Sequence, residues 1–234
     1  MDQIAKTVAR VASRARLSQQ ETTCHPKCDG YSEEERQYWI NLATEPTPEQ
    51  RLAQLRMLWN DFDPHHPQLT MALGRLECFV LGAGPLALVL AGNCGCGKTH
   101  LASAVFRYLV ASGRMMSEPD MVAHIQAGYG GQGESEAQIL DKLSAAEMLV
   151  IDDVGTAHVR GESRTWIESI YWRVLEGRAR RNRRAMLTTN LDIERLGARL
   201  GTRAMSRLMG MMGSKEDGYV DLFEVPDYRT RGWR

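Results

Sequence analysis

Two hydrophobic patterns alternate along the second part of the chain. Short apolar runs, two of them ending in polar residues, lie at 85–91, 148–153 and 185–190. Longer stretches in which apolar residues recur every three or four positions lie at 69–80, 100–109 and 162–176. The short runs are typical of strands buried inside a parallel sheet, and the longer spacing is typical of helices with one buried face. The alternation predicts an α/β fold with a parallel sheet flanked by helices.

Weaker signals predict further elements of the same domain. Arg114–Met116 is a weak candidate strand, and Ser117 followed by Pro119 is typical of the start of a helix. A short helix is expected over Leu200–Leu208. The alternating pattern of Gly218–Val225 predicts a closing strand.

The N-terminal part has its own helical pattern. Asp2, Ser32 and Thr47 can each cap a helix. The first helix is basic and amphipathic, so it either docks on a partner protein or packs on its own domain. A breaker segment rich in Asp, Pro and His then interrupts the pattern. We therefore expect a small helical N-terminal region, residues 1–66, followed by a second domain, residues 67–234.

A possible zinc site lies in the N-terminal region. Cys24, His25 and Cys28 stand close together, but no second Cys or His pair lies nearby. A closed zinc site needs four ligands, which this segment does not supply. A loop with two free thiols is therefore preferred over zinc.

The segment Gly92–Thr99 carries the clearest chemistry. It fits the phosphate-loop pattern G-x-x-x-x-G-K-[ST] at every required position, between an expected strand and an expected helix. Its three glycines let the backbone wrap around phosphates, and the helix offers its N-terminus to the same charge. Lys98 can reach the outer phosphates, and the Thr99 hydroxyl is placed to bind Mg²⁺.

Polar residues end two of the expected strands. Ligands of parallel sheets bind at the carboxyl ends of strands, so these residues should face the phosphate loop. We expect Asp152 to hold Mg²⁺, either directly or through another ligand, and Asp153 to orient or activate the attacking water. Asn190 is the preferred candidate for a hydrogen bond to the γ-phosphate or the water, with Thr189 second.

Three other segments each allow two interpretations. Arg203 and Arg207, one helical turn apart, could meet a transferred phosphoryl group across a subunit boundary, or could be ordinary exposed residues. The cluster Arg178–Arg184 could bind a nucleic-acid backbone or complement the end of the preceding helix. The loop Gly128–Gly133 could contact nucleic acid or be an idle connection.

Composition says more about the cellular compartment of the protein than about its binding partner. Lys plus Arg and Asp plus Glu both number 29, so no net charge favours nucleic acid. No uncharged apolar run is long enough to span a membrane, and the N-terminus lacks the apolar region of a signal peptide. Five cysteines, two of them in the phosphate loop, favour a reducing cytosol. We therefore expect a cytoplasmic protein with no membrane partner.

Four motifs, in chain order, resemble one family. They are Gly-Lys-Thr-His-Leu-Ala from Gly97, Leu-Val-Ile-Asp-Asp-Val-Gly from Leu149, Leu-Thr-Thr-Asn-Leu from Leu187 and Gly-Thr-Arg-Ala-Met-Ser-Arg-Leu from Gly201. Together they are similar to the AAA+ ATPases of bacterial and phage helicase loaders, the DnaC/DnaI type. The IstB transposition ATPases and the initiator DnaA share most of this core. The first two motifs indicate only an ATPase, and the last two narrow the class.

The resemblance implies an AAA+ P-loop NTPase core without a C-terminal lid, and a set of site residues. The residues implied to bind ATP or ADP are Gly92, Asn93, Cys94, Gly95, Cys96, Gly97, Lys98, Thr99, His100 and Asp152. Mg²⁺ would be held by Thr99 and Asp152. The implied catalytic set is Lys98, Asp153, Asn190 as a sensor and Arg207 as an arginine finger acting in trans, with Arg203 as its neighbour.

The resemblance also implies an ATP-dependent loader of a hexameric DnaB-type replicative helicase onto single-stranded DNA. The N-terminal region would grip the helicase. Asp153 stands where many AAA+ proteins have Glu, and its shorter reach favours slow hydrolysis, stimulated by assembly or by DNA. One alternative is an IstB-like transposition helper that remodels duplex DNA. Another is a nucleotide-dependent adaptor with negligible turnover.

Overall fold

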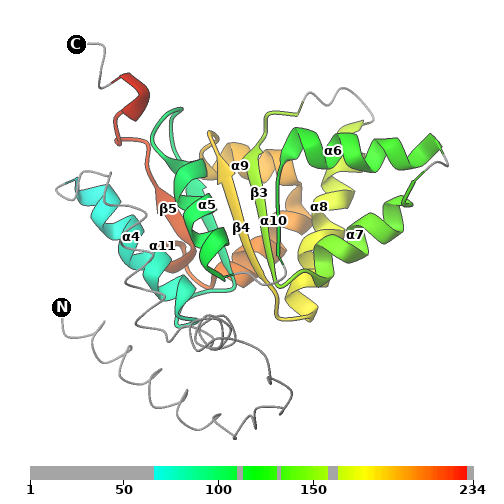
Figure 1. Cartoon of the computed structure of the whole chain (residues 1–234), viewed down its shortest axis with the longest axis horizontal. Helices are drawn as coiled ribbons and strands as arrows, with labels where there is room; N and C mark the ends of the chain where they lie inside the picture. Colours follow the sequence, from blue (N-terminus) through cyan, green and yellow to red (C-terminus); the bar gives the residue numbers. More distant parts are fainter. Residues whose placement is uncertain (1–65, 110–112, 131–132, 158–162, 231–234) are drawn as a thin grey trace, which may run out of the picture.

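The computed structural model describes residues 66–109, 113–130, 133–157 and 163–230, which form an α/β domain (Figure 1). Five parallel strands form one sheet in the order β2-β3-β4-β1-β5. The strands are β1 (Ala87–Ala91), β2 (Gly113–Ser117), β3 (Met148–Val154), β4 (Arg184–Thr189) and β5 (Tyr219–Asp221). The predicted parallel α/β fold is confirmed. The helices predicted for the N-terminal region and the candidate zinc ligands Cys24, His25 and Cys28 lie outside the described residues.

Helices cover both faces of this sheet. They are α4 (Pro67–Val80), α5 (Lys98–Leu109), α6 (Glu118–Ala127), α7 (Glu136–Ala145), α8 (Ser163–Arg180), α9 (Ile193–Leu200), α10 (Thr202–Met212) and α11 (Lys215–Gly218). Two short 3₁₀ turns are η1 (Gly128–Gly130) and η2 (Tyr228–Thr230). Among these described helices, none combines the length and the apolar character needed to cross a bilayer.

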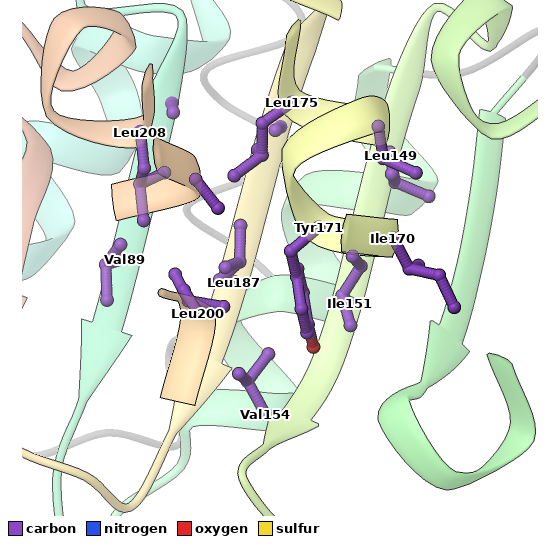
Figure 2. Close-up of a cluster of buried hydrophobic side chains, with 14 of the residues drawn as sticks. Val89, Leu149, Ile151, Val154, Ile170, Tyr171, Leu175, Leu187, Leu200 and Leu208 are labelled. Atoms are coloured by element: carbon purple, nitrogen blue, oxygen red, sulfur yellow. The ribbon is translucent and has the colours of Figure 1, made fainter. Parts of the chain in front are cut away.

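The alternation of side chains along the buried strands produces two core layers. Leu88 and Leu90 of β1 point to the layer covered by α4 and α5. Val89, between them, points to the opposite layer, which is covered by α6 to α10. Figure 2 shows this second layer, with Tyr171 of α8 standing among strand residues and Leu208 of α10 beside Val89. Both faces of β1 are therefore buried, as its continuous apolar run predicts.

The carboxyl ends of three neighbouring strands meet at one edge of the sheet. β1 and β4 pair in register up to Ala91 and Thr189, and the Gly92 amide donates to the Thr189 carbonyl at 3.1 Å. The pairing of β3 with β4 shifts register between Ile151 and Val154. This irregularity contains Asp153, whose φ of 53° is in the left-handed region. The pairing thus brings the phosphate loop and the strand-end polar residues to the same edge.

Two expected elements have different bounds in the structure. The short helix predicted over Leu200–Leu208 is present as α10, but its predicted start is wrong, because Leu200 ends α9 and Gly201, at φ 79°, separates it from α10. A left-handed φ is accessible to glycine at little cost, and it breaks the helix there. The closing strand is shorter than the predicted Gly218–Val225, because pairing with β1 covers only Tyr219–Asp221.

Helix α7 has clear sequence signals that the hydrophobic pattern did not bring out. Ser135 and Gln138 form a capping box at its start, each side chain bonding to the other residue's backbone N–H. Ile139, Leu140 and Leu143 then bury one face against α8. The helix is ten residues long and begins shortly after the glycine-rich stretch, for which only a loop was predicted.

The arginine cluster at the end of α8 contains a structural residue. The Arg178 side chain is fully buried and donates to the carbonyl oxygens of Leu143, Glu147 and Arg184. Arg184 donates to the carbonyl of Phe79 at 3.0 Å and lies over its ring. These two residues join α8, α7, β4 and α4. The carbonyls that they contact lie outside α8, so neither interpretation of the cluster made from the sequence describes these two residues.

The exposed members of the cluster have partners within the chain. Arg180 pairs with Glu176 at 2.7 Å, Arg181 with Asp141 at 2.6 Å, and Arg183 lies 4.0 Å from Glu147. Surface pairs of this kind contribute little to stability, so they could exchange for other anions. Arg178 is therefore a buried structural residue, whereas the other members of the cluster described here are exposed and basic.

Replacing Arg178 with Met should lower the free energy of unfolding by about 3 kcal/mol, because three backbone carbonyls, one of them in a buried hydrogen bond, lose a charged donor. Chemical denaturation measures the change. Arg180→Met is the matched control, since its side chain is 78% exposed, and it should cost less than about 1 kcal/mol. Equal small effects for both variants would contradict the structural role of Arg178.

Candidate nucleotide-binding site

A cavity of about 530 Å³ opens at the carboxyl edge of the sheet. Its walls come from the loop between β1 and α5, from α5 itself, from the ends of β3 and β4, and from η2. Among the residues proposed from the sequence, those that line it are Cys94, Gly95, Gly97, Lys98, Thr99, His100, Asp153 and Asn190. The cavity thus collects side chains from segments that are separated by nearly a hundred residues in the sequence.

The phosphate loop wraps around the side chain of Lys98. This side chain is almost fully buried, and its ammonium donates to the carbonyl oxygens of Gly92 at 2.9 Å and Asn93 at 2.7 Å. Gly95 and Gly97 have positive φ values of 76° and 94°, which allow so tight a turn. The loop therefore holds a positive charge at its centre.

Three residues of the predicted phosphate-loop set do not line the cavity: Gly92, Asn93 and Cys96. Cys96 is fully buried, and its sulfur lies 3.7 Å from the Lys98 nitrogen. Burial raises the pKa of the Cys96 thiol, although the nearby Lys98 charge opposes this shift. A neutral thiol packs beneath the loop at little cost.

Asp152 is held in place by two threonine hydroxyls. The Thr99 hydroxyl donates to its carboxylate at 3.0 Å, from the first turn of α5. The Thr188 hydroxyl, from β4, contacts the same carboxylate and also accepts the Asp153 amide at 2.9 Å. Thr188 therefore fixes both acids relative to β4, a role that the sequence pattern did not reveal.

Asp153 lines the cavity at the point where the backbone turns away from β3. Burial raises the pKa of the Asp153 carboxyl, and the nearby Asp152 charge raises it further. The charges of Lys98 and Arg229 oppose this rise. Because φ at Asp153 is 53°, the irregularity of β3 between Ile151 and Val154, and not regular extended backbone, directs this side chain.

The two polar residues at the end of β4 have different surroundings. Asn190 lines the cavity, and its Oδ1 atom is buried with no hydrogen-bond partner in the described residues. Thr189 is fully buried, where its hydroxyl donates to the Val154 carbonyl and accepts the Leu191 amide. An unpartnered buried oxygen at the cavity wall fits a ligand, whereas Thr189 is already satisfied.

Arg207 does not reach this cavity within its own chain. It lies on α10, where its Nε atom is 2.6 Å from a carboxylate oxygen of Glu176 on α8. Its side chain remains 46% exposed. Arg203, one turn earlier, lines a separate groove beside Trp172. Both arginines therefore lie on α10, and neither lines the cavity of the phosphate loop.

A buried carboxylate supports the turn after Asp153. Glu118, at the start of α6, is fully buried and accepts hydrogen bonds from the amides of Gly155 at 2.8 Å and Ala157 at 3.0 Å. It also accepts from Tyr171 and pairs with Arg199 at 2.8 Å. No sequence motif marks Glu118, because its partners are assembled by the fold.

The residues present fit a nucleotide polyphosphate and a magnesium ion. Lys98 and the positive-φ glycines suit phosphate oxygens. The Thr99 hydroxyl and the Asp152 carboxylate, in contact with each other, are the oxygen ligands that Mg²⁺ prefers. No cluster of three or more His, Cys, Asp or Glu occurs in the described part of the chain. Mg²⁺ commonly takes its other ligands from water and phosphate, so two protein ligands suffice.

Curated relatives match about half of the chain. It is 30% identical over 125 residues to the replicative helicase loader DnaC of Escherichia coli strain K12, covering 52% of this chain and 49% of that protein. It is 29% identical over 126 residues to DnaC of Buchnera aphidicola subsp. Baizongia pistaciae, covering 52% and 50%. The chain thus spans about half the length of the curated relatives it matches.

Solved structures share the fold. A crystal structure of the DnaC helicase loader matches with a TM-score of 0.56 and 20% identity, over 70% of this chain and 94% of that one. DnaI matches with a TM-score of 0.56 and 20% identity, over 74% and 92%. AMPPCP-bound DnaA from Aquifex aeolicus matches with a TM-score of 0.55 and 15% identity, over 71% and 50%. At these identities the matches establish an AAA+ P-loop fold.

The family description IstB-like ATP binding protein matches residues 78–210, which is more than half of the chain. The matched range contains the phosphate loop, both strand-end acids, Asn190 and Arg207. The family match thus covers most of the residues that line the cavity, and the chain belongs to the family of IstB-like ATP binding proteins.

Proposed function

We propose that this protein is an ATP-dependent loader of a hexameric replicative helicase onto single-stranded DNA. The observation that carries the proposal is the meeting of Lys98, Asp153 and Asn190 in one cavity of an AAA+ fold. Helicase loading is chosen as the function because the curated relatives are named as helicase loaders. Residues 1–66 would form the separate region that grips the helicase, and residues 67–234 would form the ATPase domain.

Lys98, Thr99 and Asp152 bind the nucleotide in this proposal. The ammonium of Lys98 is held by two loop carbonyls, and it would exchange part of this contact for phosphate oxygens. Thr99 and Asp152 would hold Mg²⁺, which neutralises charge on the phosphates when bound. Because Thr188 already fixes Asp152, the site needs little rearrangement to receive a nucleotide.

Asp153 and Asn190 act on the hydrolysis step. Asp153 orients the attacking water and accepts hydrogen bonding from it, and its raised pKa strengthens its basicity. The buried Oδ1 of Asn190 accepts a hydrogen bond from the same water. Alternatively, the amide nitrogen of Asn190 donates a hydrogen bond to the γ-phosphate. We expect slow turnover, because Asp reaches less far than Glu.

Arg207 acts on the nucleotide of a neighbouring subunit. It cannot serve its own cavity, since it lies on α10 and is paired with Glu176. This pair would have to open on assembly, which fits the partial exposure of the arginine. An arginine that arrives from a partner stabilises charge on the transferred phosphoryl group, so hydrolysis would wait for assembly.

A second candidate function is a transposition helper that remodels duplex DNA. The match to the IstB-like family favours it, because that family description covers more of this chain than the curated loaders do. The ATP site would act in the same way in both functions. The difference lies in the partner, which is a helicase in the first case and duplex DNA in the second.

Lys98→Ala should weaken ATP binding at least about tenfold, because a buried charged donor to the phosphates is lost. Isothermal titration calorimetry with Mg²⁺ and a non-hydrolysable ATP analogue measures this. Lys142→Ala is the matched control, since Lys142 is an exposed α7 residue paired with Glu134. Unchanged affinity in Lys98→Ala would contradict the site.

Arg207→Ala should leave ATP binding intact but lower concentration-dependent ATP hydrolysis by about a hundredfold or more, because the charge in trans is lost. Turnover is measured over a range of protein concentrations. Mixing Arg207→Ala with Asp153→Asn should restore part of the activity, since one variant supplies an intact cavity and the other an intact arginine. A loss that is equally large in dilute monomer, without rescue on mixing, would rule out action in trans.

Native mass spectrometry of the full chain with the replicative helicase of its host should detect a defined complex when ATP is present. The mass also gives the number of subunits. A helicase that stays an unbound hexamer, together with ATP-dependent assembly on duplex DNA, would replace the loader function by the transposition function.

A further inference from the structure

The chain turns sharply after β3, next to the end of β4. The amide and the hydroxyl of Thr156 both donate to the Asp153 carbonyl, at 3.2 Å and 2.7 Å. Gly155 has a φ of 101°, and a Cβ atom there would lie 2.6 Å from the side chain of Leu191. Leu191 directly follows Asn190, one of the two residues proposed to contact the attacking water. The turn after β3 therefore packs against the segment that begins at Asn190.

Glu118 holds this turn from the start of α6. Its Oε2 atom accepts hydrogen bonds from the amides of Gly155 at 2.8 Å and Ala157 at 3.0 Å. Its Oε1 atom accepts a hydrogen bond from the Tyr171 hydroxyl at 2.8 Å. Because Glu118 is fully buried, water does not compete for these hydrogen bonds. One carboxylate thus fixes the backbone of the turn.

Arg199 joins the same turn to α9. Its Nε atom donates to Oε1 of Glu118 at 3.0 Å and its Nη2 atom donates to Oε2 at 2.8 Å, so the pair has two parallel hydrogen bonds. The Nη2 atom also donates to the Ala157 carbonyl at 3.0 Å. Helix α9 is capped by Asp192, two residues after Asn190. The pair therefore links the turn after β3 to the helix that follows β4.

Neither member of the pair lines the nucleotide cavity. Its lining residues include neither Glu118 nor Arg199. Nucleotide binding is assigned to other groups, because Lys98 is held by carbonyls of the phosphate loop and the Thr99 hydroxyl donates to Asp152. We therefore expect the pair to affect the hydrolysis step, through the backbone, and not the binding of ATP.

We infer that Glu118 and Arg199 are positioning residues for ATP hydrolysis, which set Asp153 relative to Asn190. The inference rests on the proposed ATPase function. A φ of 53° at Asp153 is strained for a residue other than glycine, and it persists only where the surroundings enforce it. Asp153 and Asn190 come from different strands, and two groups that act on one water must keep a fixed spacing. The pair supplies a link between them outside the sheet.

The experiment measures ATP turnover and ATP binding of full-length variants in parallel. Turnover is taken at saturating ATP, at a protein concentration above which the rate per subunit no longer rises. Isothermal titration calorimetry with Mg²⁺ and a non-hydrolysable ATP analogue gives the Kd. Arg199→Lys should lower kcat about tenfold and change the Kd less than about twofold, because lysine keeps the charge but cannot form the two parallel hydrogen bonds. Glu118→Gln should lower kcat at least as much, and the double variant little more, because both changes break one link.

A second carboxylate in the chain provides the matched control. Glu136 is the first residue of α7, as Glu118 is of α6, and it accepts hydrogen bonds from the Tyr129 hydroxyl and the Trp166 ring nitrogen and pairs with Arg173. None of these control residues lines the cavity. Glu136→Gln and Arg173→Lys should therefore leave kcat and Kd unchanged, even where they lower the melting temperature.

Each result separates the possibilities. Lower melting temperatures with unchanged kcat in Arg199→Lys and Glu118→Gln would mean that the pair is only structural, and would overturn the inference. A loss of analogue affinity as large as the loss of kcat would overturn it as well. Removing one partner of a buried pair can prevent folding, so Arg199→Lys decides the question if Glu118→Gln does not fold. A wild-type chain without turnover would overturn the proposed ATPase function and the inference with it, whereas normal wild-type turnover with unaffected variants would overturn the inference alone.

Discussion

The buried carboxylate of Glu118 is the constraint on which the nucleotide cavity depends. A carboxylate removed from water is stable only if charged or hydrogen-bonding partners surround it. Its partners here are the Arg199 guanidinium, the Tyr171 hydroxyl and two backbone amides of the turn that follows Asp153. These groups come from α9, α8 and the end of β3. Satisfying one charge therefore fixes the end of β3 that carries Asp153.

The charged groups at the centre of the site also have hydrogen-bond partners within the chain. The Lys98 ammonium is held by two carbonyls, and the Asp152 carboxylate by the hydroxyls of Thr99 and Thr188. Each charge has internal partners, so the cavity keeps its shape without a ligand. The unpartnered Oδ1 of Asn190 is different, because Asn190 lines the space that a nucleotide would fill. The site is thus preorganised at its base and unsatisfied at its rim.

Three arginines show that the residue type alone does not determine the role of a residue. Arg178 is buried and satisfies three carbonyls, so it is part of the core. Arg207 rests against Glu176 on the outside of α8 and is proposed for a neighbour's site. Arg199 pairs with the buried Glu118 and joins α9 to the turn after β3. All three belong to basic stretches of sequence, and only burial and contacts distinguish them.

The sequence by itself determined the parallel α/β fold, the phosphate loop and the acids at the end of β3, because these depend on local patterns: apolar runs, glycine spacing and a Lys-Thr pair at a helix start. It did not place the start of α10 at Thr202, because it did not show that Gly201 would adopt a positive φ. It also gave no sign of Glu118, Thr188 or Arg199. Their roles depend on contacts between residues that lie 35 or more positions apart, such as Thr188 with Asp153 and Arg199 with Glu118. Only the tertiary structure decides such contacts, because they follow from strand order and packing and not from any local pattern.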